Sequence, residues 1–337
     1  MKNSKTAGAA TAATLEPRNP AHPVRRDLDA VEAKLSRLLD SNEALIGEIC
    51  HYLIDGGGKR LRPLFILLVY RACGGDDQKA EDAVDAAIAL ELIHSATLLH
   101  DDIIDGGELR RGKPSAFARY GQAASLVAGD YLFCRAFELC GRFEERLVRT
   151  AAQACIQLTE GEVMEGRMRH NAAASLEDYI AVITRKTASL FSAGGRVAAD
   201  LAGSRARTIG AMEQLGRALG LAFQMVDDLL DVIGPEEKIG KPVGSDLRAG
   251  IISLPVVLGV QANSELRRMF GNGVRLGGAE LERALKLMRA PSLIARGRAM
   301  AAEQVAVARE ILERQLRPSV YRDCLAALID DQIDRDV

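Results

Sequence analysis

The stretch DAVDAAIALELIHSATLLHDDIID, residues 82–105, is apolar on nearly every side until it reaches its aspartates. A helix that is hydrophobic all round is buried inside a protein. The whole chain of 337 residues has only 4% aromatic residues and no Trp, so Leu, Ala, Val and Ile must fill its core. Such residues favour helices over β-sandwiches. The stretch therefore predicts the core helix of an all-α protein.

Helical periodicity continues on both sides of this stretch. In VRRDLDAVEAKLSRLLD, residues 24–40, the apolar residues form one stripe. LRPLFILLVYRACGG, residues 61–75, reads as a helix that begins near Pro63 and ends at Gly74. Convincing strand alternation is absent. Further helices are predicted over residues 122–141, 145–170, 175–202, 204–232, 253–270, 277–289, 291–315 and 317–333. We therefore expect a disordered tail over residues 1–23 and one all-α domain over residues 24–337, a bundle of ten or more helices.

The overall charge and the cysteines exclude several classes of function. A net charge of -2 with 27% charged residues indicates neither a nucleic-acid partner nor a strongly basic membrane-binding surface. The six cysteines form no CxxC pair and no Cys/His ligand pattern, which favours free thiols in a reducing compartment. The N-terminus lacks the apolar segment of a signal peptide, and no apolar run is expected to span a membrane. We expect a cytoplasmic protein without a transmembrane segment.

Carboxylates gather at the end of the first stretch. Asp101 and Asp105 are four residues apart, so they lie one above the other on one helix face, and Asp102 is displaced by about 100°. Carboxylates this close repel one another unless a cation lies between them, and hard divalent cations prefer oxygen ligands. Taken alone, the stretch is explained equally well by a solvated acidic helix end.

A second stretch, FQMVDDLLDVIG at residues 223–234, repeats this spacing with Asp227, Asp228 and Asp231. Two such triplets at the ends of apolar helices are hard to explain as solvated faces, because burying carboxylates without a cation is very unfavourable. We expect the two helices to face each other across a cavity with Mg²⁺ at its mouth. Mg²⁺ usually binds one or two carboxylates together with substrate phosphates, so it implies a phosphate-bearing ligand.

Basic residues stand close to both acidic stretches. DGGGKRLRP, residues 55–63, is not a P-loop, because its spacing and its missing Ser/Thr do not fit; a flexible glycine turn beside surface cations is the alternative explanation. Anions held by Mg²⁺ at one point and by Arg or Lys at another indicate two phosphorylated substrates. The candidate anion-binding residues are Lys59, Arg60, Arg62, Arg110, Arg111, Lys186 and Lys241.

Taken together, GGGKRLRP, LLHDDIIDGGELRRGKPS, KTASLF and FQMVDDLLDVIG followed by GKPVGSDLRAG resemble the trans-isoprenyl diphosphate synthases, also called polyprenyl synthetases. The resemblance extends from about residue 25 to the C-terminus, and five ordered motifs make a specific signal. It implies an all-α bundle around a deep apolar central cavity, the isoprenoid synthase type of fold, and a homodimer.

The resemblance also implies a role for each candidate residue. Asp101 and Asp105 would hold two Mg²⁺ ions on an allylic diphosphate, and Asp227, with Asp231 nearby, would hold a third. The isopentenyl diphosphate site would contain Lys59, Arg62, His94 and Arg111, and the allylic diphosphate would be gripped by Arg110, Lys186 and Lys241. Thr187 and Gln224 would line the reacting centre. The expected catalytic set is Asp101, Asp102, Asp105, Lys186, Thr187, Gln224, Asp227 and Asp228.

Two histidines of the first stretch receive different interpretations. His94 lies two helical turns before Asp101 and is expected to face the same cavity, although a satisfied core histidine is the alternative. His100 matches no functional position of the family and is expected to be structural.

The implied reaction needs no nucleophilic side chain. Divalent ions and basic residues stabilise the departing pyrophosphate, and the apolar cavity shelters the carbocation from water. The isopentenyl double bond attacks this carbocation, and a proton is lost to the released pyrophosphate.

Ala96, five residues before Asp101, is expected to border the growing chain. The family often has an aromatic residue there in short-chain enzymes and a small one in long-chain enzymes, so Ala96 implies a long-chain product of the quinone side-chain precursor type. Close helix packing is the alternative explanation of this alanine. An apolar product also implies transient membrane contact during its release.

The chain departs from the family pattern at two places. Gly250-Ile251 stands where many members have Gly-Lys, which is read as a trait of a long-chain subclass, and the C-terminus is unusually acidic. Three alternatives stay open: a geranylgeranyl or farnesyl diphosphate synthase, a regulatory subunit of a two-component synthase, and a terpene cyclase or head-to-head condensing enzyme. Intact acidic motifs disfavour the regulatory subunit, and GGGKRLRP disfavours the cyclase.

Overall fold

Helix α4 (Ala80–Asp105) crosses the middle of the computed structural model, which describes residues 21–58, 60–234, 243–271 and 276–333. Most of its side chains are buried, because neighbouring helices pack around it. By length and composition alone α4 could cross a membrane, contrary to the expectation that no apolar run is long enough, but 83% of its most apolar window is buried. It is the core helix that its sequence predicts.

Helices before and after α4 build a bundle around it. The N-terminal elements are η1 (His22–Val24), α1 (Arg25–Leu38), α2 (Ala44–Ile54) and α3 (Leu61–Ala72). After α4 come α5 (Ala116–Tyr120), α6 (Gln122–Cys140), α7 (Glu145–Met168), α8 (Leu176–Ile183), η2 (Thr184–Ala188), α9 (Ser189–Leu201) and α10 (Ala206–Ile233). The C-terminal part contains α12 (Ser245–Ala249), α13 (Leu254–Ala262), α14 (Ser264–Gly271), α15 (Gly278–Met288), α16 (Pro291–Gln315) and α17 (Val320–Asp330).

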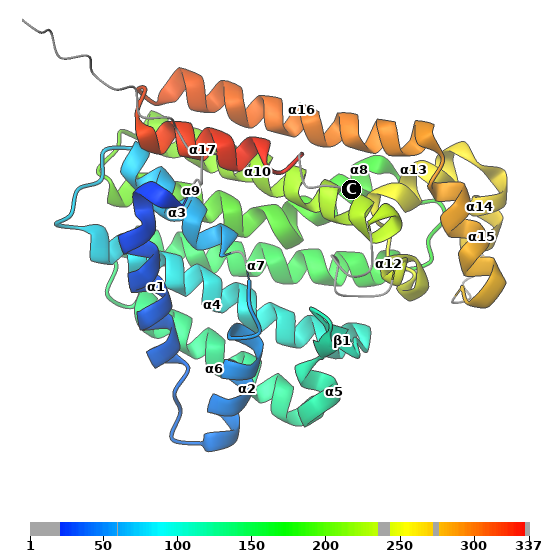
Figure 1. Ribbon diagram of the computed structural model, residues 1–337, viewed down its shortest axis with the longest axis horizontal. Coiled ribbons are helices and arrows are strands. Elements are labelled where there is room, and N and C mark those ends of the chain that lie inside the picture. The colour runs from blue at the N-terminus through cyan, green and yellow to red at the C-terminus, as the bar shows by residue number, and fades with distance from the viewer. Residues whose placement is uncertain (1–20, 59, 235–242, 272–275, 334–337) are drawn as a thin grey trace, which may run out of the picture.

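The long helices run along the long axis of the molecule, with α16 on one side and α10, α7 and α4 beneath it (Figure 1). Helix α10 packs against both α9 and α16, and α4 packs against α3 and α6. Glycines permit the close approach of α9 and α10: a Cβ at Gly216 would lie 2.2 Å from the carbonyl oxygen of Phe191, and one at Gly195 would lie 2.1 Å from that of Met212. The α9–α10 pair therefore sets the position of the second acidic stretch.

The all-α fold and the prediction of ten or more helices are confirmed. The predicted helix over residues 253–270 is interrupted at Asn263, whose side-chain oxygen accepts hydrogen bonds from the backbone N–H groups of Glu265 and Leu266 and so starts a new helix. The predicted helix over residues 175–202 is a continuous run of α8, η2 and α9, in which η2 is a π-helix.

Two short segments differ from the sequence-based expectation. A hairpin of β1 (Leu109–Arg110) and β2 (Lys113–Pro114) follows α4, and its strands are too short to show alternation. Residues 22–24 form η1, so the folded chain begins before residue 24, whereas residues 1–20 of the predicted tail lie outside the described part.

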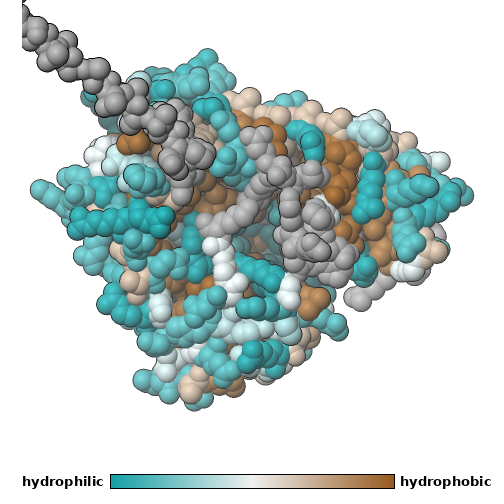
Figure 2. All heavy atoms as spheres, in the orientation of Figure 1, coloured by the Kyte–Doolittle hydropathy of each residue, from teal (hydrophilic) through white to brown (hydrophobic). Residues whose placement is uncertain are grey.

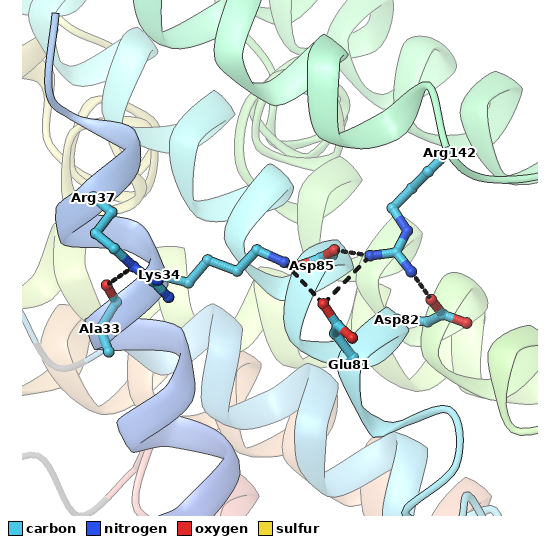
Figure 3. Close-up of polar contacts among 7 residues, drawn as sticks. All are labelled: Ala33, Lys34, Arg37, Glu81, Asp82, Asp85 and Arg142. Atoms are coloured by element: carbon cyan, nitrogen blue, oxygen red, sulfur yellow. Dashed lines mark hydrogen bonds and ion pairs between the residues drawn. The ribbon is translucent and has the colours of Figure 1, made fainter.

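A network of charged side chains joins the N-terminal helix to the core (Figure 3). Asp85 of α4 is completely buried and forms ion pairs with Lys34 of α1, at 2.5 Å, and with Arg142 in the turn after α6. Arg142 also contacts Asp82, and Lys34 contacts Glu81. The surface is mostly hydrophilic in the view of Figure 2, with hydrophobic patches toward the end that carries α13 to α15.

Candidate active site

A cavity of about 900 Å³ opens between the C-terminal halves of α4 and α10. Both acidic stretches reach it, and the glycine turn before α3 forms another part of its wall. The lining also has an apolar part, which contains Leu98, Leu158, Ile183, Leu190 and Phe223. The prediction that the two acidic helices face each other across a cavity is confirmed.

Two carboxylates of the first stretch line the cavity. Asp101 and Asp105 lie on the last turn of α4, which ends at Gly106 in the left-handed conformation (φ 64°) that glycine adopts readily. Burial raises the pKa of Asp101 to about 7, with Lys186 acting in the opposite direction. A nearby cation would stabilise the charged form of a carboxylate that is buried in this way.

Asp102 faces the other way and is tied to the hairpin. Arg110 donates two hydrogen bonds to it, and the backbone of Gly107 approaches the same aspartate closely. The turn between the strands places Arg111 at φ 52° and Gly112 at φ 74°. Both arginines still line the cavity, so the hairpin carries two cations to its mouth.

Lys186 enters the cavity from the π-helix η2. Its ammonium lies 2.6 Å from a carboxylate oxygen of Glu162 and 2.7 Å from one of Glu165, both on α7. Although burial opposes the charge, these carboxylates and Asp101 raise the pKa of Lys186. The close packing of Gly161 against the backbone of Lys186 brings α7 to this position. Sequence reasoning missed both glutamates, because only the tertiary fold brings them beside the lysine.

The second stretch contributes Asp227 and Asp228 to the lining. Asp227 is exposed, whereas Asp228 is buried and accepts hydrogen bonds from the Tyr179 hydroxyl (2.8 Å), the Gln224 amide (2.7 Å) and the Leu254 N–H (2.9 Å). Burial and the neighbouring Asp246 raise the pKa of Asp228 to about 8. This aspartate therefore organises the wall of the cavity.

Thr187 and Gln224 lie together on that wall, as the resemblance implied. The Thr187 hydroxyl donates to the Gln224 side-chain oxygen at 2.7 Å, and both residues line the cavity. A chain of hydrogen bonds thus runs from η2 to the second acidic stretch.

Asp231 does not take the place predicted for a metal ligand. Its carboxylate is 1% exposed and accepts hydrogen bonds from the Ser245 hydroxyl (2.6 Å) and from the N–H of Asp246 (3.2 Å). It is absent from the described lining, whereas Asp246 is part of it. The chain after α10 folds back, so that in this structure Asp231 contacts α12 and Asp246 lines the cavity; a metal-ligand role of Asp231 stays a prediction.

The glycine-turn side of the cavity carries Arg62 and His94. The Arg62 guanidinium stacks 4.8 Å from the Phe191 ring, and its Nε is buried without a hydrogen-bond partner. Burial lowers the pKa of Arg62 to about 10, with Glu91 acting in the opposite direction. His94 lines the cavity, and burial followed by the nearby arginines holds its pKa well below its usual value. A neutral histidine and an arginine with an unused donor can both receive an anion.

Arg60 has a different role from the other arginines of this turn. It is held by Glu32 of α1 (2.6 Å) and Glu91 of α4 (3.4 Å), so its charge is already paired. It supports the turn at the cavity edge. Lys59 and Lys241, the two remaining predicted anion-binding residues, lie outside the described residues.

Ala96 does not border the cavity as predicted. It is fully buried in the hydrophobic core, and among the described residues the lining includes its neighbours His94, Thr97 and Leu98 instead. Adjacent helical residues point about 100° apart, so a small rotation of α4 decides which of them reaches the space. His100 is structural, as expected: its ring packs on Gly129 and contacts the Leu126 carbonyl at 3.1 Å.

The donor set fits divalent cations that are shared with a phosphate ligand. Within the described residues, no three His, Cys, Asp or Glu side chains gather closely enough to hold a metal by themselves. Asp101 and Asp105 on one wall and Asp227 on the other nevertheless present hard oxygen ligands to one cavity. Mg²⁺ commonly takes one or two carboxylates and completes its octahedron with substrate phosphates and water.

Comparisons with known proteins agree with this geometry. The profile of the polyprenyl synthetase family matches residues 43–288. The short chain isoprenyl diphosphate synthase of Methanothermobacter thermautotrophicus is 36% identical over 85% of this chain and 89% of its own. The octaprenyl diphosphate synthase of Haemophilus influenzae is 33% identical over 92% and 94%. The structure of a polyprenyl synthase from Caulobacter crescentus, complexed with calcium and isoprenyl diphosphate, superimposes with a TM-score of 0.89 at 33% identity over 94% and 97%.

Proposed function

Because this chain belongs to the polyprenyl synthetase family and is a trans-prenyltransferase, we propose that it elongates an allylic diphosphate by repeated head-to-tail condensation with isopentenyl diphosphate. Its product is a long-chain all-trans polyprenyl diphosphate. The observation that carries this proposal is one cavity whose lining combines acidic residues on two facing walls, several cations and a set of apolar side chains. Two charged headgroups and one growing apolar chain fit these three groups of residues.

The cations around the mouth divide between two anionic groups. Arg62 and Arg111, on the glycine-turn side with the neutral His94, bind isopentenyl diphosphate. Arg110 and Lys186, beside Asp101, bind the allylic diphosphate. Asp101, Asp105 and Asp227 would hold Mg²⁺, which would supply positive charge that stabilises the leaving diphosphate. We propose three ions with substrate present.

The protein then orients the reacting atoms and excludes water. Thr187 and Gln224, fixed by Asp228, lie beside the reacting carbons, while Leu190 and Phe223 form apolar surface that shelters the positive charge. The C4 double bond of isopentenyl diphosphate attacks the allylic C1 as its C–O bond breaks. A proton leaves C2 for the departing pyrophosphate, so the product keeps one diphosphate and gains five carbons.

A long-chain product is favoured over a short-chain one. The octaprenyl synthase relative matches nearly the whole chain, and the first residues above Asp101 that reach the cavity are Leu98 and Thr97, neither of them aromatic. A geranylgeranyl or farnesyl diphosphate synthase is the second candidate function, because one relative is a short chain isoprenyl diphosphate synthase. A released long-chain product is apolar, so we also propose transient membrane contact, within the cytoplasm where free cysteines persist.

The outer face of α6 supports the proposal of a homodimer. Leu126, Val127 and Phe137 expose about half of their side-chain surface, and Phe133 stacks on Phe137 with ring centroids 6.5 Å apart. A row of exposed apolar side chains on one helix fits a second copy of the same face. Light scattering should find a dimer, and Phe137→Glu should shift it toward the monomer.

The direct test of the function is the length of the product. The purified chain is incubated with Mg²⁺, farnesyl diphosphate and radiolabelled isopentenyl diphosphate, and the dephosphorylated products are separated by thin-layer chromatography. Products longer than C30 support the proposal. Products that stop at C20 establish the short-chain alternative, and no incorporation at all overturns the proposed reaction.

A further inference from the structure

Arg169, at the C-terminal end of α7, is a cation without a role in the site described above. One of its Nη atoms forms an ion pair with Asp105, the aspartate that lines the cavity at the end of α4. Its Nε is buried and has no hydrogen-bond partner. Arg169 is not itself part of the described lining, but it contacts the lining residue Asp105. A guanidinium carries five N–H donors in a rigid fork, so Arg169 stands directly behind Asp105 with donor capacity unused.

The backbone after Arg169 is held in place from the opposite wall. His170 adopts φ 59°, which is uncommon for a side-chain-bearing residue, and its N–H donates to the Gly250 carbonyl at 2.9 Å. The His170 ring covers Gly250 so closely that a Cβ there would lie 2.3 Å from it, and it also packs on Phe270. Arg169 is therefore fixed between the end of α4 and the turn that joins α12 to α13.

Among the described residues, the cavity wall beside this turn carries no cation. Its described lining consists of Asp246, Ile251, Ile252 and Ser253, none of which is a cation. The cations in the described lining belong to the glycine turn, the hairpin and η2. Arg169 is anchored through His170 directly to Gly250, the residue that precedes Ile251. It is thus placed to supply a cation where that wall meets the first acidic stretch.

We propose that Arg169 binds the allylic diphosphate in the loaded enzyme after Asp105 has turned to a metal ion. This inference rests on the proposed function. The Asp105 oxygen that pairs with Arg169 cannot serve a metal and the guanidinium equally well, so metal binding removes the partner of a largely buried cation. Phosphate oxygens then offer a bidentate acceptor to the same fork, including the Nε that is unpaired in the free protein.

The test measures binding of inorganic pyrophosphate, the diphosphate without its prenyl chain, by calorimetry in the presence of Mg²⁺. Wild type is compared with Arg169→Gln, Arg169→Lys and the control Arg167→Gln, which removes an exposed arginine two residues earlier on the same helix. Arg169→Gln should weaken pyrophosphate binding by about 10-fold, the loss expected for a charged hydrogen bond. The pyrophosphate affinity of Arg169→Lys should lie between those of wild type and Arg169→Gln, and the affinity of Arg167→Gln should equal that of wild type.

Steady-state kinetics provide a second readout. The KM for the allylic substrate should rise in Arg169→Gln, while the KM for isopentenyl diphosphate should stay near that of wild type. If Arg169→Gln binds pyrophosphate like wild type but needs less Mg²⁺, Arg169 only competes for Asp105 and the inference is overturned. Should Arg169→Gln fail to fold by circular dichroism, Arg169→Lys decides: unchanged pyrophosphate affinity in that variant overturns it as well.

Failure of the proposed function has a different signature. In that case wild type itself would bind no pyrophosphate with Mg²⁺ and would incorporate no isopentenyl diphosphate. A wild type that does both, together with unaffected Arg169 variants, would reject only the role given to Arg169.

Discussion

Arg110 donates hydrogen bonds to both carboxylate oxygens of Asp102, from Nε to Oδ2 at 2.8 Å and from Nη2 to Oδ1 at 2.7 Å. This ion pair ties the hairpin to the end of α4, and it engages both carboxylate oxygens of Asp102, the middle aspartate of the first acidic stretch. Asp101 and Asp105 are left to line the cavity. Asp102 therefore positions Arg110 and α4, while the flanking aspartates are the candidates for metal binding.

Because Asp102 pairs with Arg110 and Asp101 has no such partner role, substitutions of the two aspartates should affect the stability of the metal-free protein differently. Asp102→Ala should lower the free energy of unfolding by about 1–3 kcal/mol, because it leaves Arg110 without its partner. Asp101→Asn should leave it unchanged or raise it, because burial disfavours the charge of Asp101. Urea unfolding in EDTA measures both. Equal losses in the two variants would contradict the assignment.

Removal of the metal should abolish activity. EDTA should stop incorporation of isopentenyl diphosphate, and added Mg²⁺ should restore it, because the leaving diphosphate needs divalent charge. Asp101→Asn or Asp227→Asn should lower kcat by a factor on the order of 10².

Asp231→Asn is the matched control for these variants, because Asp231 fastens α12 through Ser245 and Asp246 and does not line the cavity. It should lower Tm and leave the Mg²⁺ concentration for half-maximal activity near that of wild type. Full activity of wild type in EDTA would refute the participation of a metal. A large shift in the Mg²⁺ requirement of Asp231→Asn would show that Asp231 is a metal ligand after all.

Arg62 should distinguish the two substrates. Arg62→Met keeps an unbranched side chain over Phe191 but removes the guanidinium whose Nε is unpaired. The KM for isopentenyl diphosphate should rise about 10-fold or more, with little change for the allylic substrate. Initial rates with each substrate varied in turn give both constants. Similar increases for the two substrates would show that the basic residues are divided wrongly.

Thr97 should influence product length, whereas Ala96 should influence stability. Thr97→Phe places a ring in the cavity and should shift the products toward C15–C20 while the first condensations continue. Ala96→Phe inserts the same ring into the closed core and should cost about 1–3 kcal/mol or more through overpacking. Chromatography of the products and urea unfolding separate the two effects. A shorter product from a stable Ala96→Phe protein would restore Ala96 as the residue that borders the chain.

The charged network of Figure 3 should stabilise the packing of α1 on α4. Asp85→Ala leaves Lys34 and Arg142 without their buried partner and should cost about 3–5 kcal/mol. Glu81→Ala is the control, because its exposed carboxylate contacts the same two cations and should contribute about 0–1 kcal/mol. A loss below 1 kcal/mol for Asp85→Ala would show that the network is dispensable.

The sequence alone predicted most of the long helices and the meeting of the two acidic stretches, but not the shorter helices α2, α5 and α12. Apolar patterning predicts α4 and α10 because both helices bury many of their side chains against neighbouring helices, and the spacing of Asp101 and Asp105 fixes their common face. The break at Asn263 depends on local capping, which periodicity does not record.

Tertiary structure decided which side chain at each position faces the cavity. Spacing along a helix sets the angle between Ala96 and Thr97, but the rotation of α4 against its neighbours determines which one reaches the space. Asp231 repeats the spacing of Asp105, yet the chain after α10 folds back and captures its carboxylate. Glu165 meets Lys186 only because Gly161 lets α7 approach η2. Such contacts join residues distant in sequence, so local patterns cannot specify them.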